Sequence, residues 1–95
     1  MQEQKHQYEL RIKKKAKKAL ESLPLKVKNL IEEKIRKLAF DPFGMSEGGP
    51  MEGFKNRYKF RQGSWRVIYE IDNDEIIVEV IKIGARGDVY KDGGG

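Results

Sequence analysis

The stretch that decides the fold is residues 54–71, which read FKNRYKFRQGSWRVIYEI. In its first half aromatic residues alternate with basic ones, Phe54, Tyr58 and Phe60 against Lys55, Arg57, Lys59 and Arg61. Because successive side chains of a strand point to opposite faces, this period of two predicts a strand with one packed face and one basic face. Gln62-Gly63-Ser64 predicts a turn, and residues 65–71 predict a second strand that returns beside the first.

The same reading extends to both sides of this hairpin. Residues 72–75 predict another turn and residues 76–83 a third strand. Upstream, apolar residues recur at helical spacing over residues 12–23 and again over residues 24–40, which predicts an αα-hairpin. Asp41-Pro42 ends the second helix, and the glycine-rich residues 44–53 predict a loop.

These elements predict an α+β fold. Residues 7–12 alternate as a short strand would, and this N-terminal strand can join the edge of a small antiparallel β-meander that packs against the αα-hairpin. With 95 residues, the chain is long enough for one core. We therefore expect a single domain over residues 1–95, with flexible tails at residues 1–6 and 92–95.

Composition excludes several kinds of chemistry. The chain contains no cysteine, and its single histidine, His6, lies in a predicted tail, so we expect no disulfide, metal site or cofactor. No signal peptide and no run of about 18 apolar residues is present, which predicts a soluble cytoplasmic protein without membrane contact. The net charge of +5 favours a polyanionic partner, which is RNA, DNA, an acidic protein or an anionic lipid surface.

The basic face of the strand over residues 54–61 has two interpretations. It is either the solvated outer face of a sheet or an anion site, and four neighbouring like charges repel one another unless an anion binds. Arg66 either joins this cluster from the next strand or is a simple surface arginine. A lysine-rich helix face either keeps the protein in solution or binds RNA phosphates, and its members are Lys13, Lys14, Lys17 and Lys18.

A second candidate site follows the third strand. Residues 84–90 contain two glycines, and Arg86 and Tyr90 lie near the predicted end of the strand. Tyr90 is either a site residue or a side chain that docks a tail onto the core.

Together these motifs resemble a known family. They are Leu38-Ala39-Phe40-Asp41-Pro42, Met51-Glu52-Gly53, Tyr58-Lys59-Phe60-Arg61, residues 65–71, Ile83-Gly84-Ala85-Arg86 and Val89-Tyr90. In this order and spacing the chain resembles the RelE/ParE toxin superfamily, and within it the RelE branch, over about residues 7–91. The resemblance implies a type II toxin that enters the ribosomal A site, cuts mRNA there and is held by a cognate RelB-like antitoxin.

The resemblance also implies a set of catalytic residues: Lys59, Arg61, Arg66, Arg86 and Tyr90. Arg61 stands where the best-studied branch has lysine, and because an arginine guanidinium does not give up its proton near neutral pH, it can hold a phosphate but cannot transfer a proton. Ala85 stands where relatives often have lysine or histidine, which removes one cationic group. We expect Lys55, Arg57 and the helix lysines to bind RNA or the ribosome.

The implied reaction needs no metal. Attack of a 2′-hydroxyl on the adjacent phosphate requires proton removal, stabilisation of added negative charge and protonation of the leaving oxygen. Arginines supply the charge, and Lys59 and Tyr90 share the proton transfers. Two other functions stay open: a ParE-like poison of DNA gyrase, and a non-catalytic RNA- or protein-binding module on the same scaffold.

Overall fold

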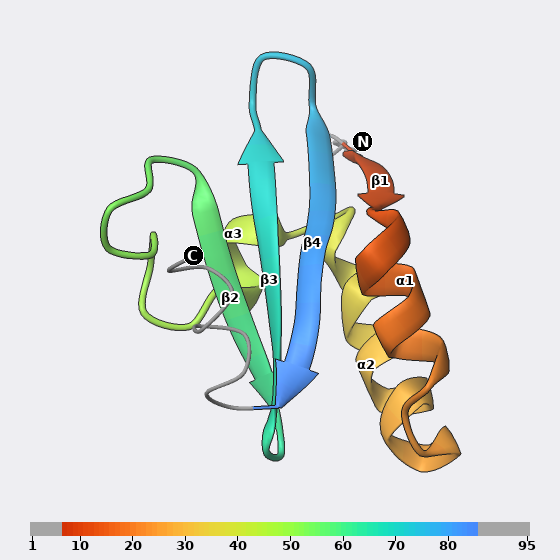
Figure 1. The fold of residues 1–95 in the computed structure, drawn as a ribbon. Coiled ribbons are helices and arrows are strands. Elements are labelled where there is room, and N and C mark those ends of the chain that lie inside the picture. Colours follow the sequence, from red (N-terminus) through yellow and green to blue (C-terminus); the bar gives the residue numbers. More distant parts are fainter. Residues whose placement is uncertain (1–6, 86–95) are drawn as a thin grey trace.

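The computed structural model describes residues 7–85. The predicted tails, together with Arg86 and Tyr90, lie outside these residues. Along the chain the elements are β1 (Glu9–Ile12), α1 (Lys14–Glu21), α2 (Leu25–Leu38), α3 (Pro42–Met45), β2 (Arg57–Gln62), β3 (Trp65–Asp72) and β4 (Ile77–Ala85). Figure 1 shows the helical hairpin of α1 and α2 beside the sheet, with the strands side by side.

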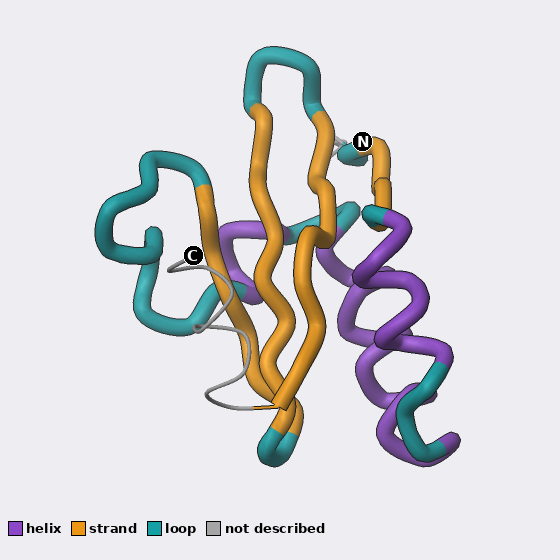
Figure 2. Tube along the Cα trace, in the orientation of Figure 1, coloured by secondary structure: helices purple, strands orange, loops and turns teal. Residues whose placement is uncertain are grey.

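The sheet confirms the predicted α+β arrangement. Its order is β1-β4-β3-β2, so the antiparallel meander of β2, β3 and β4 carries β1 at one edge. β1 runs parallel to β4, from the pair Glu9 and Ile77 to the pair Ile12 and Val80. Figure 2 shows the two tight connections that join β2, β3 and β4 into a meander.

One face of the sheet forms the core with the helices. Ala16 and Leu20 of α1 and Ile31, Ile35 and Leu38 of α2 pack against buried residues of the strands. The strand residues in this core are Phe60, Val67, Tyr69, Ile71, Val78, Val80 and Ile83. Their alternation along each strand leaves the intervening side chains on the opposite face.

Several predicted boundaries were wrong for local reasons. β2 begins at Arg57, so Phe54 and Lys55 precede the strand, and the Phe54 ring packs on the Arg57 guanidinium, 4.2 Å from ring centroid to Cζ. Gly84 and Ala85 do not leave the third strand but extend it, because they pair with Arg66 and Trp65. The two helices are shorter than predicted, since Ile12 belongs to β1 and α2 ends at Leu38.

A short helix was also missed. Asp41-Pro42 ends α2 as predicted, but it also starts α3, because the Asp41 carboxylate caps the Gly44 N–H at 3.1 Å and Pro42 suits the first turn. The Tyr69 hydroxyl donates a hydrogen bond to the Pro42 carbonyl at 2.7 Å. This bond ties α3 to the centre of the sheet.

We expect Tyr69→Phe to lower the free energy of unfolding by about 1–3 kcal/mol, because it leaves the Pro42 carbonyl without its donor. Urea denaturation followed by circular dichroism measures this change. Tyr58→Phe is the matched control, because the Tyr58 ring stacks on Tyr69 while its hydroxyl makes no hydrogen bond within residues 7–85. Equal effects of the two substitutions would contradict a special role for the Tyr69 hydroxyl.

Candidate functional site

Cationic residues from β2, β3 and β4 share the sheet face that lies away from the helices. In one row of cross-strand neighbours Lys59 pairs with Ile68, which pairs with Lys82. In the next row Arg61 pairs with Arg66, which pairs with Gly84. Side chains directly opposite on one face have Cβ atoms about 5 Å apart. We call Lys59, Arg61, Arg66 and Lys82 the basic cluster.

The register confirms the predicted alternation within β2. Tyr58 and Phe60 belong to the core face or pack against it, so Arg57, Lys59 and Arg61 lie on the opposite face. Arg66 is only 8% exposed. The alternative that it is a simple surface arginine is therefore wrong.

The sequence pattern suggested that the like charges of β2 repel one another unless an external anion binds. In the structure, carboxylates of the chain itself compensate two of these charges. Arg57 pairs with Glu70 of β3, with 2.7 Å between Nη2 and Oε2. Arg61 pairs with Glu47, with 3.1 Å between Nε and Oε1. Carboxylates of the chain itself thus supply the anions that a basic strand requires.

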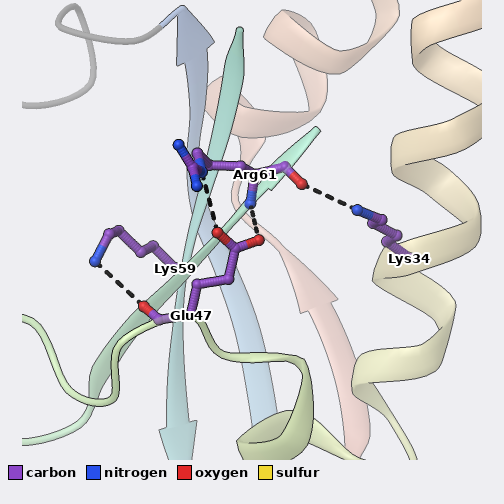
Figure 3. A network of polar contacts seen from close by, with 4 residues as sticks. All are labelled: Lys34, Glu47, Lys59 and Arg61. Atoms are coloured by element: carbon purple, nitrogen blue, oxygen red, sulfur yellow. Dashed lines mark hydrogen bonds and ion pairs between the residues drawn. The ribbon is translucent and has the colours of Figure 1, made fainter. Parts of the chain in front are cut away.

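Glu47, which follows α3, was not predicted from the sequence, yet it contacts Lys59 and Arg61, the two candidate catalytic residues of β2 (Figure 3). Its carboxylate accepts hydrogen bonds from the backbone N–H of Arg61 at 2.9 Å and from Arg61 Nε at 3.1 Å. Its carbonyl accepts one from Lys59 Nζ at 3.3 Å, and its own N–H donates to the Lys59 carbonyl at 2.9 Å. From α2, Lys34 Nζ donates to the Arg61 carbonyl at 3.0 Å.

The same contacts cover the outer edge of the sheet. β2 is an edge strand, and such an edge presents unpaired backbone groups. Here the N–H groups of Glu47 and Met51 donate to the Lys59 and Arg57 carbonyls. These hydrogen bonds attach the loop between α3 and β2, residues 46–56, to the edge of the sheet beside the site.

Two groups beside the site, Glu47 and Tyr69, have shifted pKa values. Burial acts to raise the pKa of Glu47, but the hydrogen bonds from Arg61 and the positive charges of Arg61 and Lys34 outweigh it and hold that pKa below its ordinary value. Burial, followed by the charges of Tyr58, Asp41 and Glu47, raises the pKa of Tyr69 far above its ordinary value. Tyr69 therefore stays protonated and serves as a structural donor.

The structure does not bring all the predicted residues into one surface. Lys13, Lys14, Lys17 and Lys18 are exposed, but α1 packs on the core side of the sheet, away from the basic cluster. Lys55 is exposed in the loop before β2. Arg86 and Tyr90 lie outside the described residues.

Lys82 is the member of the basic cluster that sequence reasoning missed. A bulge in β4 makes Tyr69 pair with Val80 and Ile68 pair with Lys82, so Ile81 is an extra residue. The sequence signal for this bulge was the spacing of Val80 and Ile83. Two residues that share one face of a regular strand are an even number of positions apart, and these two are three apart.

No helix within residues 7–85 combines the length and the apolar character that crossing a membrane requires.

A sequence model of a toxin family, described as the ParE toxin of the type II toxin–antitoxin system parDE, matches residues 10–90. The chain belongs to the RelE/ParE family of toxins.

Solved structures place this RelE/ParE toxin on the RelE fold. It aligns with a double mutant of the Escherichia coli toxin RelE in the free state at a TM-score of 0.73 and 22% identity, covering 90% of this chain and 92% of that chain. A chain of the archaeal RelE–RelB complex from Pyrococcus horikoshii gives a TM-score of 0.74 and 28% identity, with 85% and 97% covered. A chain of the Mycobacterium tuberculosis RelBE2 toxin–antitoxin complex gives 0.72 and 22%, with 84% and 99% covered. A search of curated proteins gave no significant match.

We expect the RelE/ParE toxin to lose part of its stability in acid through Glu47. A folded-state pKa below the ordinary 4.5 means that the ionised carboxylate stabilises the fold above that pH, and that this contribution is lost as pH falls through the folded value. Glu47→Gln should therefore be less stable than the parent at pH 7, by less than about 1 kcal/mol because the ion pair is exposed, and the difference should close in acid.

Urea denaturation at a series of pH values measures this difference. Glu52→Gln is the matched control, because Glu52 is exposed in the same loop and makes no hydrogen bond within residues 7–85. A gap between Glu47→Gln and the parent that stays constant down to pH 3 would contradict the assignment.

Proposed function

We propose that this RelE/ParE toxin is a ribosome-dependent endoribonuclease that cuts mRNA in the ribosomal A site and so stops translation in the cytoplasm. The observation that supports the proposal is the convergence of Lys59, Arg61, Arg66 and Lys82 on one sheet face. Cleavage by 2′-hydroxyl attack builds negative charge on a phosphorane, and preorganised cations stabilise such charge. The reaction requires no metal ion.

The residue types suggest a division of roles. Arg61 and Arg66, with Arg86 next after the end of β4, stabilise the charge on the phosphate. Lys59 and Tyr90 share the proton transfers, because lysine and tyrosine side chains can exchange a proton with the substrate and an arginine guanidinium cannot. Alignment of the substrate by the ribosome is part of the catalytic requirement.

The partner that we propose for the free toxin is a RelB-like antitoxin. The solved relatives include the RelBE2 complex of M. tuberculosis and the RelE–RelB complex of P. horikoshii. A protein with a net charge of +5 favours an acidic inhibitor that covers cationic surface.

A poison of DNA gyrase is the second candidate, because the matching family model carries the ParE name. The basic cluster favours the ribonuclease, since a protein that binds gyrase without nuclease chemistry does not require several cations on one sheet face. Primer extension on mRNA from cells that express the toxin separates the two functions. Codon-phased cuts support the ribonuclease, whereas gyrase-linked DNA breaks without such cuts would replace it.

Single-turnover cleavage on programmed ribosomes tests the roles. We expect Lys59→Ala to slow cleavage by about 10²–10⁴, the usual contribution of a positioned acid or base. Arg61→Ala should slow it by about 10²–10³, the usual loss for one donor to developing charge. Lys26→Ala is the control, because Lys26 is exposed at the start of α2. Parental rates for both site variants would refute the proposed site.

The exposed lysines of α1 should contribute to binding but not to the chemical step. We expect the double substitution of Lys14 and Lys18 by alanine to reduce the slope of log affinity against log salt by about 1.4, since each phosphate contact contributes roughly 0.7. The cleavage rate at saturation should stay parental. The double substitution of Lys26 and Lys37 on α2 removes the same charge and is the control. Equal slopes for the two double variants would show that the α1 lysines keep the protein in solution and do not bind RNA.

A further inference from the structure

Residue 47 directs each of its polar groups to a candidate residue of β2. Its N–H and carbonyl contact Lys59, through the Lys59 carbonyl at 2.9 Å and Nζ at 3.3 Å. Its two carboxylate oxygens contact Arg61, through the backbone N–H at 2.9 Å and Nε at 3.1 Å. Figure 3 shows Lys59 and Arg61 both in contact with Glu47. The two contacts with Lys59 come from the backbone of residue 47, whereas the two contacts with Arg61 require the glutamate carboxylate.

We propose that Glu47 is a positioning residue for the cleavage reaction, because its carboxylate holds Arg61 in the orientation that a phosphate requires, beside the Lys59 ammonium that the backbone of residue 47 anchors. The inference rests on the proposed function of this site. Glu47 acts through the two cations and does not itself contact the reacting atoms.

The geometry at Arg61 explains how the positioning works. A guanidinium has five N–H donors in a rigid plane, and Glu47 takes the one on Nε. The other carboxylate oxygen is fixed to the Arg61 backbone, so the guanidinium is oriented relative to the strand itself. The four donors on the two terminal nitrogens have no partner within residues 7–85, and the Arg61 side chain is 55% exposed. They can therefore bind phosphate oxygens as a preformed fork.

The chain directly after Glu47 passes beside the Lys59 ammonium. Gly48 has a φ of +85°, which lets the chain turn directly after Glu47. A Cβ at Gly48 would lie 3.7 Å from Lys59 Nζ. The ammonium thus lies against bare backbone and is anchored by the Glu47 carbonyl.

The exposure of the Glu47–Arg61 pair suggests a different role, in which Glu47 is an internal competitor that a phosphate must displace. The two roles predict opposite results. If Glu47 competes, its neutralisation raises both affinity and cleavage rate. If Glu47 positions the cations, neutralisation leaves affinity equal or tighter, because one negative charge is lost, but slows the chemical step.

The test is Glu47→Gln, with Glu70→Gln as the matched control. Glu70 pairs with the Nε and Nη2 of Arg57 on the same face, so its neutralisation changes the charge equally without touching Lys59 or Arg61. At saturating programmed ribosomes we expect Glu47→Gln to cut mRNA roughly 10- to 100-fold more slowly, the usual effect of a small misplacement. Its ribosome affinity should be parental or tighter, and Glu70→Gln should cut at nearly the parental rate.

A second measurement does not depend on activity. In the free protein, the Arg61 Nε–H should exchange slowly with water by ¹⁵N NMR, because it is hydrogen-bonded to Glu47. Glu47→Gln should accelerate that exchange, whereas Glu70→Gln should accelerate exchange at Arg57 alone. Rapid exchange at Arg61 in the parental protein would overturn the proposed geometry.

The outcomes separate this inference from the proposed function. A parental chain that does not cut mRNA on ribosomes overturns the function and, with it, any role of Glu47 in cleavage. A parental chain that cuts, with Glu47→Gln equal or faster, overturns the positioning role alone. Equal slowing in Glu47→Gln and Glu70→Gln would mean that the loss of one negative charge on this face, at either position, slows cleavage. That result also overturns the positioning role of Glu47.

Discussion

The register of β3 between β2 and β4 is the constraint on which the rest of the structure depends. It places Val67, Tyr69 and Ile71 under the helices and leaves Arg66 on the other face. A slip of one residue would exchange the two faces, burying Arg66 in the apolar core and exposing Val67. Burial of a charge without partners costs far more than a single apolar contact contributes, so the register is strongly determined. The basic cluster is a direct consequence of the way the core packs.

Concentrating cations on one face requires compensation within the chain. Glu70 and Glu47 provide it, each through an arginine of β2. Both ion pairs are partly exposed and therefore weak, on the order of 1 kcal/mol or less. Charge pairs of this kind relieve repulsion in the free protein without closing the face to a phosphate. The fold thus combines a firmly packed core with a polar face that stays open to a phosphate.

The sequence predicted those parts of the fold that depend on local periodicity. Tyr58 and Phe60 alternate with Lys59 and Arg61 regardless of what packs on the strand, so the two faces of β2 were predictable. Trp65 to Ile71 followed from the same period and from the turn at Gly63.

Features that depend on pairing between distant segments could not be predicted in this way. The bulge at Ile81 moves Lys82 onto the open face, and it exists because Ile83 must return to the core. Glu47 lies in a glycine-rich loop without periodicity, and its contacts with β2 span 12 and 14 residues of sequence. Ala85 pairs with Trp65 and so lies on the face away from Lys82, which only the register reveals. The missing cation at position 85 is therefore not a loss from the basic cluster itself.

The central claim is that the sheet face bearing the basic cluster binds RNA phosphate. NMR titration with a short RNA whose riboses are 2′-O-methylated tests it most directly, because that RNA can bind but cannot be cut. We expect the largest side-chain perturbations at Lys59, Arg61 and Lys82, diminishing as salt is raised. Perturbations confined to the lysines of α1, or spread evenly over all cationic side chains, would contradict the account.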